Sequence, residues 1–249
     1  MRIILSPAKK MNADVDSLEY LGLPASLSKT ERILQWLKSK SYDELKTLWK
    51  CNDKIAKENF QRLEQMDLYS NLTPAVLAYD GIAYQYMAPA VFEYGQFDYV
   101  QQHLCILSAF YGVLKAMDGV VPYRLEMQAK ADIDGYKNLY DFWGRQIYDL
   151  VRDDDGIIIN LASKEYSKCI EKYLTDKDFY VTCTFVEKYN GKLVTKATYA
   201  KMARGEMVRY MAENNIETPD DIKSFDRLGY KFRDDLSTER EYVFERVEK

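Results

Sequence analysis

Histidine is almost absent from this sequence, and its scarcity narrows the chemistry open to the chain. His103 is the single histidine among 249 residues. Neither a zinc site built from several histidines nor an iron site of two histidines and one carboxylate can therefore form within one chain. The four cysteines include no C-x-x-C pair, which argues against a zinc site and a disulfide framework. We expect neither a bound metal nor a cofactor. A catalytic triad built on His103 is an alternative, although its helical spacing from Tyr99 and Leu107 favours a core or boundary role.

Long apolar runs and linkers are also missing. No stretch approaches the ~18 apolar residues of a membrane span. Only three bulky apolar residues follow the charged start "MR", whereas a secretory signal needs roughly 7 to 15. We therefore expect a cytoplasmic protein with no membrane partner. Without a repeat, a low-complexity segment or a Pro/Gly-rich boundary, a single domain over residues 1–249 is the simplest organisation.

The charge is close to balanced but unevenly distributed. Residues 28–62 hold nine Lys/Arg against five Asp/Glu, and residues 188–210 hold six against one. Residues 63–160 hold six against fourteen, and the net charge is −4. A near-neutral total can hide a basic face, although solvated helix surfaces would give the same counts.

The pattern of apolar residues predicts an α+β fold in one compact domain, with a mixed sheet and surrounding helices. Ser41 and Glu44 form a capping box at the start of one helix. Asn190-Gly191 between two alternating runs predicts a hairpin with a type I′ turn. Thr218 and Pro219 indicate another helix start. The remaining predictions are strands at 2–5 and 157–160, three helices within 28–65, mostly helix over 97–117, a helix over about 198–213 and a final hairpin in 229–246.

The segment "PYRLEM", residues 122–127, is predicted to be a strand. Alternation would place Tyr123, Leu125 and Met127 on one face and Arg124 and Glu126 on the other. The polar face either meets solvent or presents an arginine and a carboxylate to a cleft. The segment alone favours the first alternative.

Two predicted strands are followed by a serine and then a lysine. Ser6 and Lys9 follow the first strand; Asn160 ends the second, with Ser163 and Lys164 behind it. A helix N-terminus offers free N–H groups to anions, and such ends gather in a crevice of open α/β sheets. Two ordinary N-caps with solvated lysines are the alternative.

The segment "KMARG" combines two cations with a glycine. Lys201 and Arg204 are three residues apart and share a helix face. Gly205 within a helix costs ~1 kcal/mol relative to alanine. That cost indicates that something approaches closely there, either a ligand or a packed helix.

Residues 48–60, "LWKCNDKIAKENF", are similar to the turn of a helix-hairpin-helix element, which would span about 41–63. In such a turn, backbone N–H groups and lysines hold phosphates. The candidate residues here are Lys50, Asn52, Lys54 and Lys57. The glycines usual in that turn are absent, and the residues alone favour an ordinary helical hairpin.

Several sequence blocks in fixed order resemble one family over nearly the whole chain: the YaaA family of bacterial peroxide-stress-resistance proteins. The blocks are "SPAK" (6–9), "FYGVLKAMD" (110–118), "PYRLEM" (122–127), "LYDFWG" (139–144), "INLASKEY" (159–166), "KMARG" (201–205) and "GYKFRDD" (229–235).

The resemblance implies a cytoplasmic α+β domain that aids survival of hydrogen peroxide and keeps intracellular free iron low. It also implies DNA binding, through a basic cleft and a helix-hairpin-helix element. The family's "SDEY"-type block reads "SKEY" here, so Lys164 departs from it. The family's characteristic residues correspond to Lys9, Arg124, Glu126, Asn160, Ser163, Lys201, Arg204 and Gly205.

The resulting hypothesis is one cleft that collects these residues, with four cations and one carboxylate. Its first interpretation is a DNA-binding stress protein. The alternative is an enzyme acting on a damaged base, a nucleotide or another phosphorylated substrate, with Lys9, Arg124 and Glu126 as candidate catalytic residues. Direct iron binding by carboxylates, including those in residues 233–235, is the weakest interpretation.

Overall fold

A mixed sheet of eight strands forms the centre of the computed structural model, which describes residues 1–13 and 18–247. The strands, including those of two small two-stranded sheets, are β1 (Arg2–Leu5), β2 (Lys10–Met11), β3 (Thr73–Pro74), β4 (Tyr79–Asp80), β5 (Leu104–Ser108), β6 (Gly112–Lys115), β7 (Gly119–Val120), β8 (Ile157–Asn160), β9 (Phe179–Tyr189), β10 (Lys192–Val194), β11 (Tyr230–Phe232) and β12 (Glu241–Arg246).

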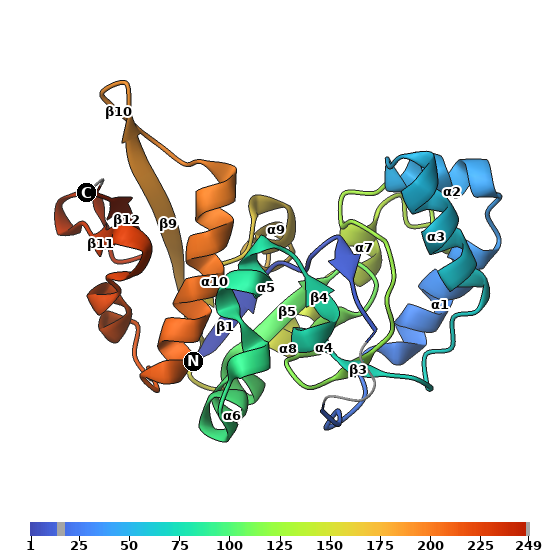
Figure 1. Cartoon of the computed structure of the whole chain (residues 1–249), viewed down its shortest axis with the longest axis horizontal. Helices are drawn as coiled ribbons and strands as arrows, with labels where there is room; N and C mark the ends of the chain where they lie inside the picture. The colour runs from blue at the N-terminus through green and yellow to red at the C-terminus, as the bar shows by residue number, and fades with distance from the viewer. Residues whose placement is uncertain (14–17, 248–249) are drawn as a thin grey trace.

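Helices lie around this sheet, and three of them form a group at one end of the molecule (Figure 1). That group contains α1 (Leu27–Lys38), α2 (Tyr42–Trp49) and α3 (Asp53–Glu64). The other helices are α4 (Ala75–Ala78), α5 (Ile82–Met87), α6 (Tyr94–His103), α7 (Leu139–Trp143), α8 (Gln146–Val151), α9 (Lys164–Glu171) and α10 (Ala197–Glu213), with the 3₁₀ turns η1 (Pro89–Val91), η2 (Asp220–Ser224), η3 (Arg227–Gly229) and η4 (Asp234–Leu236).

The order of the strands creates a crevice at the carboxyl ends of the parallel strands of the main sheet. The order is β11-β12-β9-β8-β1-β5-β6, and β10 pairs with β9. Strands β12, β9, β8, β1 and β5 run parallel, whereas β6, β10 and β11 pair antiparallel. Strand β1 lies between β5 and β8. After β1 the chain adds β5 and β6 on one side of it and later adds β8 and β9 on the other, so the order of the strands reverses at β1. Ligands of open α/β sheets bind at such a point, beyond the carboxyl ends of the strands.

The central strand is buried on both faces, as expected for a parallel sheet covered by helices. Ile3, Ile4 and Leu5 of β1 are each at most 1% exposed. They belong to one hydrophobic cluster that extends from α1 to β12. The α+β class, with a mixed sheet and helices around it, is confirmed.

Most of the predicted elements are present. The strands at 2–5 and 157–160 and three helices within 27–64 are confirmed, and both bonds of the Ser41 capping box form. The turn between β9 and β10 has φ of +50° at Asn190 and +76° at Gly191, as a type I′ turn requires. The helix expected over about 198–213 is α10, and β11 and β12 form the final hairpin.

Two predicted helical regions are wrong in part. Helix α6 ends at His103, and the apolar run behind it forms strands β5 and β6 instead of continuing the helix over 97–117. A short, fully buried apolar run carries no periodicity that separates a strand from a helix. The helix expected at Thr218 is only the 3₁₀ turn η2, and Thr218 does not cap it: its Oγ1 donates to Asp221 Oδ2 at 2.8 Å.

The strand predicted for residues 122–127 is not formed: the segment has no regular secondary structure, pairs with no strand of the described sheets and enters a turn at Met127. The predicted alternation nevertheless holds, since Tyr123, Leu125 and Met127 are buried while Arg124 and Glu126 are partly exposed. The segment crosses the carboxyl ends of the strands, where the Tyr123 hydroxyl meets Ser108 Oγ, at the end of β5, at 2.7 Å. Burial of one face therefore set this pattern without a hydrogen-bonded ladder.

No helix within residues 1–13 and 18–247 is long and apolar enough to cross a membrane.

Candidate functional site

A pocket of about 400 Å³ opens beyond the carboxyl ends of β1 and β8. It collects five cations, three carboxylates and two serines from segments far apart in the chain. The sequence hypothesis expected four cations and one carboxylate, so the pocket is richer in both. These charged and hydroxyl side chains are Ser6, Lys9, Lys10, Asp80, Arg124, Glu126, Ser163, Glu165, Lys201 and Arg204.

The two serines meet at the base of this pocket. The Ser163 N–H donates to Ser6 Oγ at 2.8 Å, and the Ser6 hydroxyl donates to Ser163 Oγ at 3.1 Å. Ser163 is the N-cap of α9, as predicted. No helix follows Ser6, because the chain passes through Pro7 toward the short strand β2.

Asn160 lies behind the pocket and does not line it. Its Oδ1 accepts a hydrogen bond from the Ala162 N–H at 2.9 Å, and its Nδ2 donates to Thr182 Oγ1 at 3.2 Å. Only 4% of this residue is exposed. Asn160 therefore shapes the turn that presents Ser163, and it has no direct access to a ligand.

Ion pairs join lysines to carboxylates along the rim. Lys9 Nζ lies 2.9 Å from Glu126 Oε2, and Lys10 pairs with Asp80. Lys164, by contrast, is outside the pocket lining and pairs with Glu171 farther along α9. The structure thus brings Lys9 and Glu126 together but separates Lys164 from them.

Two arginines enter the pocket with incomplete hydrogen bonding. The Nε atoms of Arg124 and Arg204 are buried and have no hydrogen-bond partner within the described structure. Burial also holds the pKa of the Arg204 guanidinium below its usual range. An unpartnered buried donor costs ~1–3 kcal/mol, and more when it is charged. Guanidinium groups left in this state are suited to an anion, which they bind through two parallel N–H bonds.

Gly205 is explained by helix packing. A Cβ at this position would overlap the carbonyl oxygen of Ala83 in α5. Helices α5 and α10 are in close contact along this stretch. The close approach predicted from the sequence therefore exists, and the neighbour is a helix and not a ligand. Gly205 acts on the pocket indirectly, by letting α5 and α10 form one of its walls.

Glu165 is a pocket residue that sequence reasoning missed. Burial raises the pKa of its carboxyl, and the nearby Glu126 carboxylate raises it further. Its Oε1 accepts a hydrogen bond from the Gln128 N–H at 3.3 Å. The residue stood within the quoted "SKEY" block, but an acid in the first turn of a helix is common because the helix dipole favours it. For that reason Glu165 did not stand out in the sequence as a candidate site residue.

Buried tyrosines lie at the pocket, and Tyr84 and Tyr123 are among its lining residues. The hydroxyl of Tyr123 is 2.9 Å from that of Tyr79, and Tyr84 donates to the Ser6 carbonyl at 3.0 Å. Burial raises the pKa of Tyr123 to about 12. These side chains orient residues 122–127 over the strand ends, and they stay neutral at physiological pH.

Helices α2 and α3, called here the helical hairpin, contain the other predicted phosphate-binding residues. Asn52 caps α3 through its Oδ1, which accepts the Ile55 N–H at 3.0 Å, while Lys50 takes the left-handed conformation with φ of +46°. Lys54 and Lys57 are exposed, and Lys57 pairs with Asp53 at 2.9 Å. None of these residues lines the pocket.

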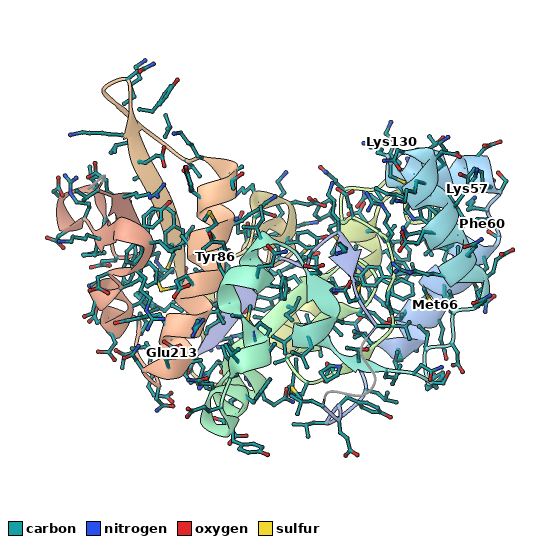
Figure 2. The ribbon with its side chains drawn as sticks, in the orientation of Figure 1. Lys57, Phe60, Met66, Tyr86, Lys130 and Glu213 are labelled. Atoms are coloured by element: carbon teal, nitrogen blue, oxygen red, sulfur yellow. The ribbon has the colours of Figure 1, made fainter. Side chains whose placement is uncertain are left out.

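The helical hairpin lies at the opposite end of the molecule from the β9–β10 hairpin, as Lys57 and Phe60 show in Figure 2. One contact connects it to the pocket. Arg124 Nη2 donates to the carbonyl of Trp49, the last residue of α2, at 3.5 Å. The guanidinium that lines the pocket therefore also holds the end of a hairpin helix.

Neither His103 nor residues 233–235 line the pocket. His103 is buried against Tyr99, with ring centroids 4.4 Å apart, and its Nδ1 lies 2.8 Å from the Met1 carbonyl oxygen. Asp235, in the block proposed to lend oxygen ligands to iron, pairs with Arg233 at 2.7 Å. Residues 1–13 and 18–247 contain no group of three His, Cys, Asp or Glu side chains placed to hold a metal ion.

Comparison with known proteins gives consistent matches over the whole length. The family model described as peroxide stress protein YaaA matches residues 1–236. A UPF0246 protein of Agathobacter rectalis is 69% identical over 246 residues, which cover 99% of each chain. UPF0246 proteins of Lachnoclostridium phytofermentans and Ligilactobacillus salivarius are 53% and 54% identical, each over 98% of this chain and over 96% and 99% of their own.

Proposed function

Because this chain belongs to the peroxide stress protein YaaA family, we propose that it acts in the peroxide stress response by binding DNA in the cytoplasm. The pocket and the helical hairpin are the proposed contact sites. Bound protein would shield or recognise damaged DNA. Its effect on intracellular free iron would then be indirect, through DNA damage or its repair.

The observation that carries this proposal is the pair of arginines, Arg124 and Arg204, whose buried Nε atoms have no hydrogen-bond partner within the described structure. Lys9, Lys10 and Lys201 lie in the same pocket. A phosphodiester would supply the missing acceptor oxygens, and arginine forms bidentate bonds with phosphate. The exposed Lys54 beyond the α2–α3 turn, close to Lys50, supports a second phosphate contact at the helical hairpin.

The test measures binding to labelled duplex, single-stranded and bubble-containing DNA by fluorescence anisotropy across a salt series. Two double variants are compared with the wild type: Lys201→Ala with Arg204→Ala, and Lys50→Ala with Lys54→Ala. Each lost phosphate contact should weaken binding and lower the slope of log K against log salt by ~0.9. A loss in both variants would support one DNA path over the pocket and the helical hairpin.

A matched control removes two lysines at the opposite ends of the strands, away from the pocket. Lys172 follows α9 at the end away from the pocket, and Lys177 precedes β9; both are exposed. Lys172→Ala with Lys177→Ala should leave the salt slope unchanged. If the wild type binds no DNA at moderate salt, or if the control loses as much as the other variants, specific DNA binding through these sites is wrong.

A second candidate function is an enzyme that acts on a damaged base, a nucleotide or another phosphorylated substrate in the same pocket. The carboxylates in the pocket favour this function, because a site that only neutralised the charge of DNA would not require them. Glu165 has a raised pKa, whereas Glu126 is ion-paired with Lys9 at 2.9 Å. Two carboxyl groups in such different environments are suited to act as proton donor and proton acceptor.

Incubation with nucleotides and with peroxide-treated oligonucleotides, followed by mass spectrometry, would reveal a product. Glu126→Gln and Glu165→Gln keep the shapes of the side chains but remove their acid–base function. Both variants should retain DNA affinity and form no product. A collapse of DNA affinity in Glu126→Gln would assign that residue a structural role, and no product with the wild type would refute the enzymatic alternative.

A further inference from the structure

The β9–β10 hairpin extends away from the rest of the sheet (Figure 1). It does so beyond the carboxyl end of β8, where the pocket also opens. Strand β9 is parallel to β8 and pairs with its last residue, Asn160, at Thr182. It then continues to Tyr189, which at ~3.3 Å per residue is roughly 23 Å past the end of β8. Residues 188–194 are called here the arm. Among the described strands, Lys188 and Tyr189 pair only with Leu193 and Lys192, and Val194 pairs with Glu187, the last residue of β9 that β12 reaches.

The arm is basic and exposes apolar surface. Residues 188–205 contain five Lys/Arg and no Asp/Glu. Lys188 and Lys192 are exposed and form no ion pair with any described residue. Tyr189 is 56% exposed and Leu193 is 41% exposed. The conformation of the chain therefore holds a tyrosine and two lysines in solvent, and no described carboxylate forms an ion pair with either lysine.

The base of the arm is firmly attached to the sheet. Lys196 pairs with the buried Glu187, and its Nζ lies 5.0 Å from the Tyr189 ring centroid. Arg246 of β12 stacks over Tyr199 with its guanidinium carbon 4.2 Å from the ring centroid. A projection that is already ordered loses little conformational entropy when it binds a partner.

The arm leads directly into the pocket. Helix α10 starts at Ala197 and carries Lys201 and Arg204, which line the pocket. Lys201 is five residues beyond Lys196, which at ~1.5 Å per helical residue is about 7.5 Å along the axis of α10. Lys192, Lys196, Lys201 and Arg204 therefore follow one another along the chain from the arm to the pocket, and of these Lys196 is already ion-paired with Glu187.

We infer that the arm is a third nucleic-acid contact, which binds the DNA backbone beside the stretch held by the pocket. The inference rests on the proposed DNA binding and extends it to a surface outside both the pocket and the helical hairpin. Lys188 and Lys192 contact phosphates, and Tyr189 packs on a sugar or on an unpaired base. A two-stranded ribbon is a known shape for groove contacts, and phosphate is the partner that unpaired lysines complement.

The test is the salt dependence of binding to a 24-base-pair duplex. Lys188→Ala with Lys192→Ala should lower the salt slope by ~1.8 if each lysine contacts one phosphate. The control Lys172→Ala with Lys177→Ala removes the same charge at the opposite ends of the strands and should change nothing. Thermal melts of both variants check that the fold is intact, which we expect because all four side chains are exposed.

Trypsin cleavage gives a second measurement that does not depend on affinity. Cleavage after Lys188 and Lys192 in the wild type should slow several-fold with saturating duplex, whereas cleavage after Lys177 should not. If the arm variant binds like the wild type while the pocket variant is weakened, the inference is wrong and the proposed function stands. If the wild type binds neither this duplex nor single-stranded or bubble-containing DNA, both are wrong.

Discussion

At Gly205, the lack of a side chain lets the backbones of α5 and α10 approach each other. A Cβ there would overlap the Ala83 carbonyl oxygen, and Ala83 itself lines the pocket. A clash with backbone cannot be relieved by rotating a side chain, so one helix has to move. The position therefore controls the stability of the fold and the width of the pocket together.

Gly205→Ala should lower the free energy of unfolding by about 2–4 kcal/mol, since overpacking typically costs 1–3 kcal/mol and the obstacle here is backbone. Urea denaturation measures this loss. Gly95→Ala in α6 is the matched control, because a Cβ there meets nothing within 4 Å. Better helix propensity should make the control neutral or up to ~1 kcal/mol more stable. Equal effects at both glycines would contradict the packing explanation.

Asp118 provides a pH-dependent test at the same scale. Its Oδ2 accepts the Lys115 N–H at 2.9 Å, and burial raises the pKa of its carboxyl to about 6. The unfolded value is about 3.9, so the folded protein binds this proton more tightly than the unfolded chain. The contribution of Asp118 is therefore most favourable below about pH 4 and is lost as the pH rises through about 6.

Asp118→Asn should raise the free energy of unfolding at pH 7.5 by roughly 1–3 kcal/mol, because the amide needs no charge and its oxygen still accepts the Lys115 N–H. Near pH 4 the two proteins should have the same stability. Chemical denaturation at the two pH values measures the difference. A gain of the same size at both values would exclude proton binding as its cause.

At the residue scale, chemistry-bearing positions were predicted far better than their roles. Lys9, Glu126 and Arg204 were identified from the sequence, and the structure places them in one pocket. Glu165 was missed because its position in a first helical turn had an ordinary explanation. Gly205 was noted for close approach, but only coordinates could distinguish a helix from a ligand.

At the scale of elements, the helical hairpin shows where local chemistry determines the structure. The Ser41 capping box forms as predicted, and Asn52, which was not predicted to be a cap, caps α3 by the same kind of side-chain bond. Strands β5 and β6 were not predicted, because a buried apolar run does not reveal its own periodicity. Polar residues with capping functions thus identify an element from its sequence, and fully buried segments do so only through their neighbours.

Lys50 carries a strain that a substitution can isolate. It adopts φ of +46° at the end of α2, and the left-handed region costs an L-residue roughly 1–2 kcal/mol. Lys50→Gly should raise the free energy of unfolding by up to ~1 kcal/mol, after the entropy of glycine is allowed for. Lys50→Ala removes the same charge but keeps the strain, so only the glycine variant should be stabilised in urea denaturation. No difference between the two variants would place the strain elsewhere.

For the whole molecule, the shared hydrophobic cluster makes a single cooperative unit the expected behaviour. Phe244 in β12 is fully buried and stacks on Phe185 with centroids 5.5 Å apart. Trp36, Trp49 and Trp143 report from α1, α2 and α7, all nearer the other end of the molecule. A change near β12 should therefore reach all three tryptophans if the molecule unfolds as one domain.

Phe244→Ala should lower the free energy of unfolding by about 3–5 kcal/mol, the usual cost of removing a buried phenyl ring. Tryptophan fluorescence and far-UV circular dichroism should give the same urea midpoint. Lys231→Ala on the exposed side of β11 is the control and should shift neither signal. A fluorescence midpoint that does not move while the dichroism midpoint falls would divide the chain into two domains.

The overall fold class followed from sequence patterns, whereas the pocket required the topology. Its residues come from the turns after β1 and β8, from residues 80–84, from residues 123–126, and from α9 and α10. The position of β8 beside β1 brings the serines together, and nothing in the local pattern fixes that strand order. Long-range pairing is decided by the whole core and cannot be predicted from any one segment.

The Arg124 guanidinium contacts both the pocket and the helical hairpin, so it can couple events at the two sites. Arg124 lines the pocket and also donates to the Trp49 carbonyl at the end of α2. A ligand that draws Arg124 into the pocket withdraws this bond from the helical hairpin. By thermodynamic reciprocity, a partner that requires the bonded hairpin end must weaken that ligand by the same factor. Occupancy of the pocket and order at the end of α2 are thus expected to depend on each other through this one side chain.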